Sequence, residues 1–142
     1  MNGFTKFTAI VALAALSACA QAPEERSLYQ RLGGEPAVTE VVDDFIANVA
    51  ANPAINRRFS GVDIPMLKRL LVEQMCEATG GGCRYTGRSM RESHRGQDIT
   101  PAEFNAMGAD MLKTLDKFTV PQREKDELTA LLGSMSKDIV GQ

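Results

Sequence analysis

The sequence is poor in the residues on which most catalytic and metal sites depend. Its 142 residues include one histidine, His94, three cysteines and no tryptophan. No serine or cysteine stands in a nucleophile motif, which leaves hydrolase chemistry little to build on. Two thiols and one distant histidine make a poor zinc site. The glycines at 80–82 precede no Gly-Lys-Ser/Thr, so they do not form a phosphate-binding loop.

The sequence also has no large excess of positive or negative charge. Lysine and arginine number 16 against 18 aspartate and glutamate residues, which gives a formal net charge of -2. A nucleic-acid-binding protein usually carries a basic patch or stripe, so we expect no nucleic-acid partner. Apolar residues make up 44% of the chain, enough for a packed core. The length suits one domain.

The first residues have the order of a signal peptide. After Lys6, the uncharged stretch from Phe7 to Ala18 is shorter than the roughly 20 apolar residues of a transmembrane helix. We therefore interpret residues 1–18 as a signal peptide and expect an exported protein. A buried N-terminal helix is the alternative. Residues 19–26 are then a linker, and residues 27–142 form the folded domain.

The end of this stretch suggests how the exported chain is processed. Leu16-Ser17-Ala18-Cys19 resembles the bacterial lipobox, so we expect Cys19 to be lipidated and to anchor the protein at the periplasmic face of a membrane. Ala18-Cys19-Ala20 also satisfies the small-x-small rule of ordinary cleavage, which would release a soluble periplasmic protein.

The other two cysteines lie close together in the sequence. An oxidising compartment permits a disulfide between Cys76 and Cys83, and the glycines before Cys83 allow the chain to turn back. We expect this bridge; two free, partly buried thiols are the alternative.

From Ser27 onward the apolar residues recur at helical spacing, which predicts an all-α domain. Glycine and proline at 33–34, 52–53, 80–82 and 120–121 separate the helices. Asp63 has the position of a helix cap, and Thr100 with Glu103 forms a capping box. We expect long helices with these apolar stripes: Val38 to Val49; Leu67, Leu70, Leu71 and Met75; Phe104, Met107, Met111 and Leu115; and Leu128, Leu131, Leu132, Met135 and Ile139.

His94 is the chemically distinctive residue. It follows Met90 by four positions on a short predicted helix, so the two share a helical face. Haem requires a flat apolar slot and one axial nitrogen, and a helical domain rich in Leu, Ile, Met and Phe can supply both. A surface or capping histidine is the alternative. The sequence has no Cys-x-x-Cys-His, so covalent c-type attachment is not supported.

Residues 28–140 resemble the group 1 truncated haemoglobins. The resemblance rests on the order and spacing of several short stretches. They are Ser27-Leu28-Tyr29 with Leu32-Gly33-Gly34, Val41-Val42-Asp43-Asp44-Phe45, Arg58-Phe59-Ser60-Gly61, Gly80-Gly81, Tyr85-Thr86-Gly87, Met90 with His94, and Ile99-Thr100 with Phe104. It implies a shortened globin fold, two helices over two, around haem b.

The resemblance also implies roles for single residues. His94 matches the proximal iron ligand. Phe59 matches the corner phenylalanine against the haem edge, and Phe45 matches an aromatic of the pocket wall. Ile46, Leu67 and Leu71 fall at the distal wall, and Met90 and Met107 at the proximal side or pocket floor. The alternative for all the apolar residues is plain core.

Two departures concern the distal wall. Ile46 stands where group 1 members commonly have tyrosine, and Leu71 where they often have glutamine. Because these polar residues are the usual donors to bound O2, we expect weak or short-lived O2 binding. Gln74, one turn beyond Leu71, is expected to face solvent, with a role as substitute donor as the alternative.

We expect five-coordinate ferrous iron, because no second histidine exists. Met66, Met75 or Lys68 could reach the iron only if the distal helix moved. The expected function is binding of a diatomic gas (O2, CO or NO), including oxygen transport. The alternatives are an NO dioxygenase supplied by an electron donor, a peroxidase-like enzyme, and a haem-free helical lipoprotein that acts through protein contacts.

Overall fold

The computed structural model describes residues 25–142, so the expected signal peptide and Cys19 lie outside the described residues. The described chain is helical, in agreement with the predicted all-α class. Its elements are α1 (Leu28–Arg31), α2 (Gly34–Ala51), η1 (Asn56–Phe59), α3 (Ile64–Ala78), α4 (Met90–His94), α5 (Pro101–Lys117), α6 (Gln122–Ser134) and η2 (Ser136–Asp138), where η marks a 3-10 helix. None of these helices has both the length and the apolar character needed to cross a membrane.

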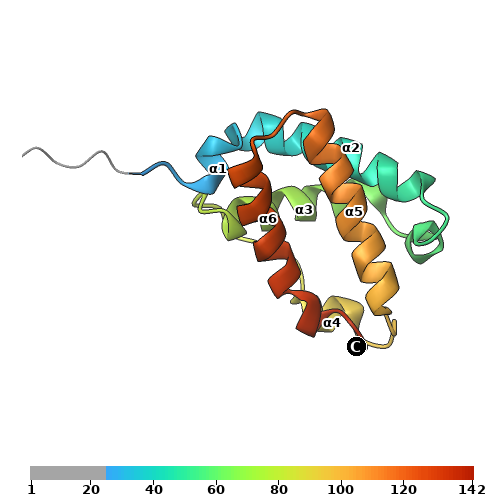
Figure 1. Cartoon of the computed structure of the whole chain (residues 1–142). Coiled ribbons are helices and arrows are strands. Elements are labelled where there is room, and N and C mark those ends of the chain that lie inside the picture. The colour runs from blue at the N-terminus through green and yellow to red at the C-terminus, as the bar shows by residue number, and fades with distance from the viewer. Residues whose placement is uncertain (1–24) are drawn as a thin grey trace, which may run out of the picture.

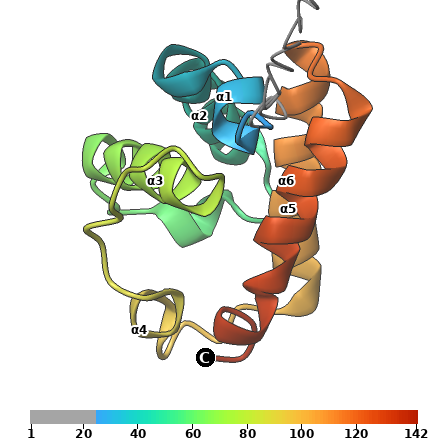
Figure 2. The same cartoon turned by 90° about the vertical axis from the view of Figure 1, so that its left-hand side faces the viewer.

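The long helices form two pairs. α2 packs against α3, and α5 lies beside α6 while also packing against α2 (Figure 1). Viewed from the side, α2 and α3 occupy one half of the molecule and α5 and α6 the other (Figure 2). The short helix α4 lies apart from these pairs, across from α3 and beside η2. This is the predicted two-over-two arrangement.

The core lies where the two pairs meet. α2 contributes Val38, Val42 and Val49, each no more than 2% exposed, from the helical face that the apolar spacing predicted. Leu115 of α5 and Leu128 of α6 are equally buried opposite them. Burying one such side chain contributes about 1.5–3 kcal/mol, so this shared core holds the pairs together without α4.

Side-chain caps fix several helix starts. The Asp63 carboxylate accepts the Met66 amide, and Thr100 and Glu103 form the predicted capping box at α5. These caps satisfy amides that have no partner within the helix. Two further capping boxes were not predicted: Ser27 with Gln30 begins α1, and Ser89 with Glu92 begins α4.

The predicted last helix is too long. The structure ends α6 at Ser134, and Ile139 lies beyond the short η2. The chain leaves the helix because its end pairs with the segment before α5. The Gly141 amide donates to the Ile99 carbonyl at 3.0 Å, and the Asp98 amide donates to the Gln142 carbonyl at 3.0 Å.

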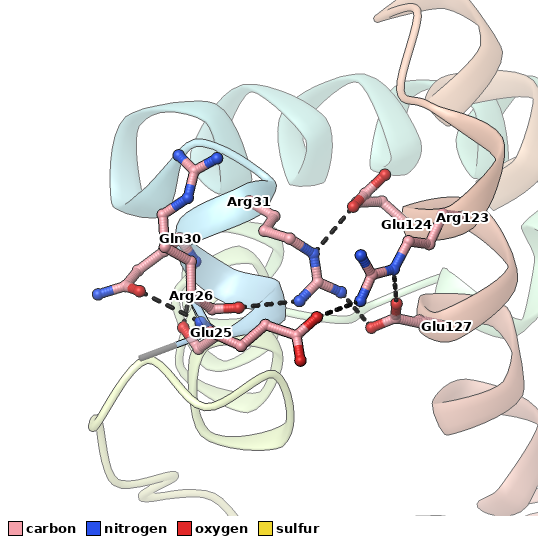
Figure 3. A network of polar contacts seen from close by, with 8 residues as sticks. Glu25, Arg26, Gln30, Arg31, Arg123, Glu124 and Glu127 are labelled. Carbon is pink, nitrogen blue, oxygen red and sulfur yellow. Dashed lines mark hydrogen bonds and ion pairs between the residues drawn. The ribbon is translucent and has the colours of Figure 1, made fainter. Parts of the chain in front are cut away.

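The start of the described chain is held to α6 by ion pairs (Figure 3). Arg31 donates to Glu124 at 2.9 Å and also pairs with Glu127. Arg123 pairs with Glu25 at 2.6 Å. The Arg31 contact holds the pKa of Glu124, which is 7% exposed, below its ordinary value. This network docks α1 far from α4.

Cys76 and Cys83 form a disulfide, with 5.7 Å between their Cα atoms. Cys76 is 1% exposed at the end of α3, and Cys83 begins the connection to α4. Gly81, between them, lies so close to the Cys76 sulfur and the Tyr29 ring that a Cβ atom at position 81 would clash with both. The bridge therefore fixes where the chain leaves α3 on its way to α4.

Candidate functional site

His94 is the last residue of α4, and its ring is oriented by its own helix. The Nδ1 atom lies 2.7 Å from the Met90 carbonyl oxygen, one turn earlier. A carbonyl oxygen can only accept, so Nδ1 carries the proton and donates it. The lone pair of the neutral ring is then on Nε2. A histidine held through one ring nitrogen, with the other free, is arranged as a metal ligand.

Polar contacts, rather than burial, hold α4 in place. None of its residues is buried. Arg91 donates to Asp138 at 2.7 Å and to Gln142 at 2.8 Å, which ties the helix to the end of the chain. The position of His94 therefore depends on a few hydrogen bonds around a short helix.

The face of α3 that turns towards α4 carries the predicted distal residues. Leu67 and Leu71 are half-buried and pack against the edge of the core. Gln74 shares this face, and its amide nitrogen lies 3.1 Å from the Met90 sulfur and 3.6 Å from the Met135 sulfur. The expectation that Gln74 faces solvent was wrong, because its half-buried side chain turns inward between α3, α4 and α6.

The remaining predicted pocket residues fall into two groups. Phe59, Met90 and Met107 are half-buried, and Phe59 and Met107 pack against the core. Phe45 and Ile46 are 4% and 5% exposed, within the core itself. Incompletely buried apolar side chains are the kind of surface that an inserted flat apolar group would cover. The haem roles of all these residues, and of Leu67, Leu71 and His94, stay a prediction.

The residues present fit haem. The structure places α4, which carries His94, across from α3, and it leaves apolar residues of α3, η1 and α5 half-buried. Among residues 25–142, no cluster of three or more His, Cys, Asp or Glu side chains offers a competing metal site. An open groove of about 490 Å³ also lies between the start of α5 and η2. Its lining is Pro101, Phe104, Asn105, Ser136, Lys137 and Val140, none of which was predicted as a pocket residue.

The corner before α3 is joined to α5 by a charged pair that sequence reasoning missed. Arg58 donates to both carboxylate oxygens of Glu103, at 2.7 and 2.9 Å. The Glu103 carboxylate, which also accepts from Thr100, has its pKa lowered far below the ordinary value, chiefly by Arg58. The capping box marked Glu103 in the sequence, but nothing there indicated a partner 45 residues earlier.

Comparisons with known proteins agree with this geometry. Residues 27–140 match the model of the family described as bacterial-like globin. The chain is 31% identical to the group 1 truncated haemoglobin of Synechocystis, over 82% of this chain and 98% of that protein. It is 30% identical to that of Mycolicibacterium paratuberculosis, over 82% of this chain and 85% of that protein.

Solved structures give the same answer for the fold. The crystal structure of the truncated haemoglobin from Tetrahymena pyriformis superposes with a TM-score of 0.80 at 25% identity, covering 82% of this chain and all (100%) of that one. The 2/2 haemoglobin from Synechococcus, with covalently attached haem, gives a TM-score of 0.77 at 33% identity, covering 81% and 98%.

The matched family, the relatives and the arrangement around His94 lead to one assignment. The cofactor is haem, and the protein is a haem-binding globin. The chain belongs to the bacterial-like globin family, among the group 1 truncated haemoglobins.

Proposed function

We propose that this globin binds a diatomic gas at five-coordinate ferrous haem whose axial ligand is the Nε2 atom of His94. The observation that carries the proposal is the 2.7 Å contact from His94 Nδ1 to the Met90 carbonyl, which uses Nδ1 as the donor and makes Nε2 the ring nitrogen available to the iron. Haem, when bound, supplies the iron centre for O2, CO or NO. The chain's own contribution is to hold the imidazole and to exclude water with Phe59, Leu67, Leu71 and Met107.

The proposed distal wall favours rapid release of O2. Ile46, Leu67 and Leu71 carry no hydrogen-bond donor on their side chains. A donor to an O2 molecule held there would be worth roughly 1.5–3 kcal/mol, as for hydrogen bonds to charged groups. Gln74 has a donor, but its amide is engaged with methionine sulfur on α4. We therefore assign the site to transient gas binding.

NO dioxygenation is a second candidate, since the family is associated with O2 binding and in some members with that reaction. It requires a long-lived complex with O2 and an electron donor. The aliphatic distal wall argues against such a complex. A peroxidase-like role is weaker still, because peroxide cleavage needs an acid–base pair that none of the proposed distal residues provides.

We further propose that the protein works outside the cytoplasm, lipidated at Cys19. The lipobox-like sequence at residues 16–19 supports this. The disulfide between Cys76 and Cys83 also supports it, because disulfides persist in oxidising compartments. Metabolic labelling with a palmitate analogue, compared between wild type and Cys19→Ala, tests the anchor.

Absorption spectra test the gas-binding proposal. We expect haem-loaded wild type to be five-coordinate when ferrous and to bind CO. His94→Gly should lose the iron–histidine band in the resonance Raman spectrum and recover an imidazole-ligated spectrum when free imidazole is added. Wild type that stays colourless with haem, or an unchanged ferrous spectrum in His94→Gly, would remove the proposal.

A further inference from the structure

One arginine joins the two segments that carry Phe59 and His94. Arg58 precedes Phe59 at the end of η1. Its guanidinium holds Glu103 in the first turn of α5 through two hydrogen bonds. A third hydrogen bond runs from Nη1 to the Gln97 carbonyl at 2.8 Å. The corner at Arg58 therefore meets, at one side chain, two neighbouring segments that lie 39 and 45 residues later in the sequence.

The contact to Gln97 continues to the end of α4. The Gln97 amide donates to the His94 carbonyl at 3.0 Å, and the Gln97 side chain donates to the Ser93 carbonyl at 2.8 Å. Gln97 thus holds the last turn of α4, and Arg58 holds Gln97. Because α4 has no buried residue, this path is one of few that locate the histidine.

Burial and several hydrogen bonds restrict the side chains of Arg58 and Glu103. The Glu103 side chain is 9% exposed and that of Arg58 is 28% exposed. One Glu103 oxygen also accepts from the Thr100 amide and hydroxyl, each at 2.9 Å. An arginine with both carboxylate oxygens and a carbonyl as partners uses the planar fork that lysine lacks.

We propose that Arg58 is a positioning residue for His94. It fixes the end of α4 relative to the corner that carries Phe59, and so sets the spacing between the two sides of the haem slot. The proposal rests on the proposed role of His94 as the iron ligand. Arg58 itself touches neither the iron nor the gas in this proposal.

The chain offers a matched control next to Arg58. Arg57 also contacts Glu103, but through one longer contact of 3.3 Å and with a side chain that is 74% exposed. A second control is Arg31, whose pair with Glu124 is as well buried and joins α1 to α6 (Figure 3). Helix α1 lies away from α4 (Figure 2). Arg57→Met removes a positive charge near Glu103 but keeps the contacts of Arg58. Arg31→Met removes an equally buried ion pair elsewhere, so it tests whether loss of any such pair destabilises the protein enough to release haem.

Haem retention and the iron–histidine bond provide the first measurements. Ferric Arg58→Met is expected to lose haem to excess apomyoglobin about tenfold faster than wild type, the cost of a charged hydrogen bond. Its ferrous iron–histidine stretching band should broaden or shift. The haem-loss rate of Arg58→Lys should lie between those of wild type and Arg58→Met, because one ammonium group cannot hydrogen-bond to both Glu103 and the Gln97 carbonyl. Arg57→Met should stay within about twofold of wild type, as exposed pairs contribute little.

The haem-free protein provides a measurement that does not depend on iron. Amide exchange at Gln97 should accelerate in Arg58→Met and remain unchanged in Arg57→Met. Wild-type protein that takes up no haem would refute the proposed function, while this exchange would still report on Arg58. The positioning role is overturned if Arg58→Met keeps wild-type haem loss and an unshifted band. Equal effects in Arg31→Met or Arg57→Met also overturn it.

Discussion

The amide nitrogen of Gln74 lies 3.1 Å from the sulfur of Met90, so the proposed distal helix touches the proximal one directly. The same Met90 residue accepts the His94 Nδ1–H through its carbonyl oxygen. α3 and the imidazole are therefore linked through one residue of α4. Because sulfur is a weak acceptor, this link orients α4 more than it stabilises the fold.

The first prediction concerns Gln74. Its amide is engaged with sulfur rather than free to reach a ligand, so Gln74→Leu should change O2 release from ferrous protein only slightly. We expect less than the roughly tenfold effect of losing a donor to bound O2. Stopped-flow O2 dissociation and the C–O stretching frequency of the CO complex measure this. A tenfold faster release with a raised C–O frequency would show instead that Gln74 donates to the ligand.

The second prediction concerns the aliphatic distal wall. Ile46→Tyr should slow O2 dissociation by about tenfold to a hundredfold, because a phenol hydroxyl donates to the charged bound O2. CO release should change little. Ile46→Phe is the matched control, since it adds the ring without the hydroxyl at a position that is 5% exposed. If both variants slow release equally, the effect is steric and the donor argument fails.

Local sequence signals predicted the fold well, and contacts between distant segments account for what was missed. The Asp63 cap and the Thr100–Glu103 box lie within one helical turn, so sequence alone reveals them. The early end of α6 depends on pairing with Ile99, some forty residues earlier, which no local pattern shows. For the same reason the sequence predicted Gln74 to face solvent. Its contacts, the sulfur atoms of Met90 and Met135, belong to segments distant in sequence.

In the site, too, contacts within one helical turn were predicted from the sequence and contacts between distant segments were not. The spacing of Met90 and His94 indicated a shared helical face, and their contact lies within one turn. The role of Arg58 could not be inferred, because an arginine in a corner sequence is ordinarily solvated. Only the fold brings it to Glu103 and to the Gln97 carbonyl.

The third prediction concerns the disulfide. Cys76→Ser with Cys83→Ser should lower the free energy of unfolding by about 2 kcal/mol, because the open chain gains conformational entropy when unfolded. Urea unfolding of wild type and the double variant, with and without reductant, measures this. Reductant should destabilise wild type and leave the double variant unchanged. Equal stability of all four samples would mean that the bridge contributes nothing.

The fourth prediction concerns Glu103 and pH. The partners of Glu103 hold its pKa in the folded protein far below the ordinary carboxyl value of 4.5. The unfolded chain therefore takes up the proton first as the pH falls. The stability contributed by the carboxylate is fully present above the unfolded pKa and is progressively lost as the pH falls towards the folded one. Glu103→Gln should thus be less stable than wild type at pH 7, with a difference that shrinks below about pH 4.

Urea unfolding of both proteins at several pH values, at constant ionic strength, tests this. Glu77→Gln is a suitable control, because that carboxylate accepts one backbone amide, from Tyr85, on the exposed side of α3. This variant removes a carboxylate that does not contact Arg58, so it separates the effect of the Arg58 pair from the loss of one negative charge. A constant difference between Glu103→Gln and wild type from pH 7 to pH 3 would mean that neutral hydrogen bonds, and not the charge on Glu103, stabilise this corner. The rigidity assigned to the pairing of Arg58 with Glu103 would then lose its electrostatic basis.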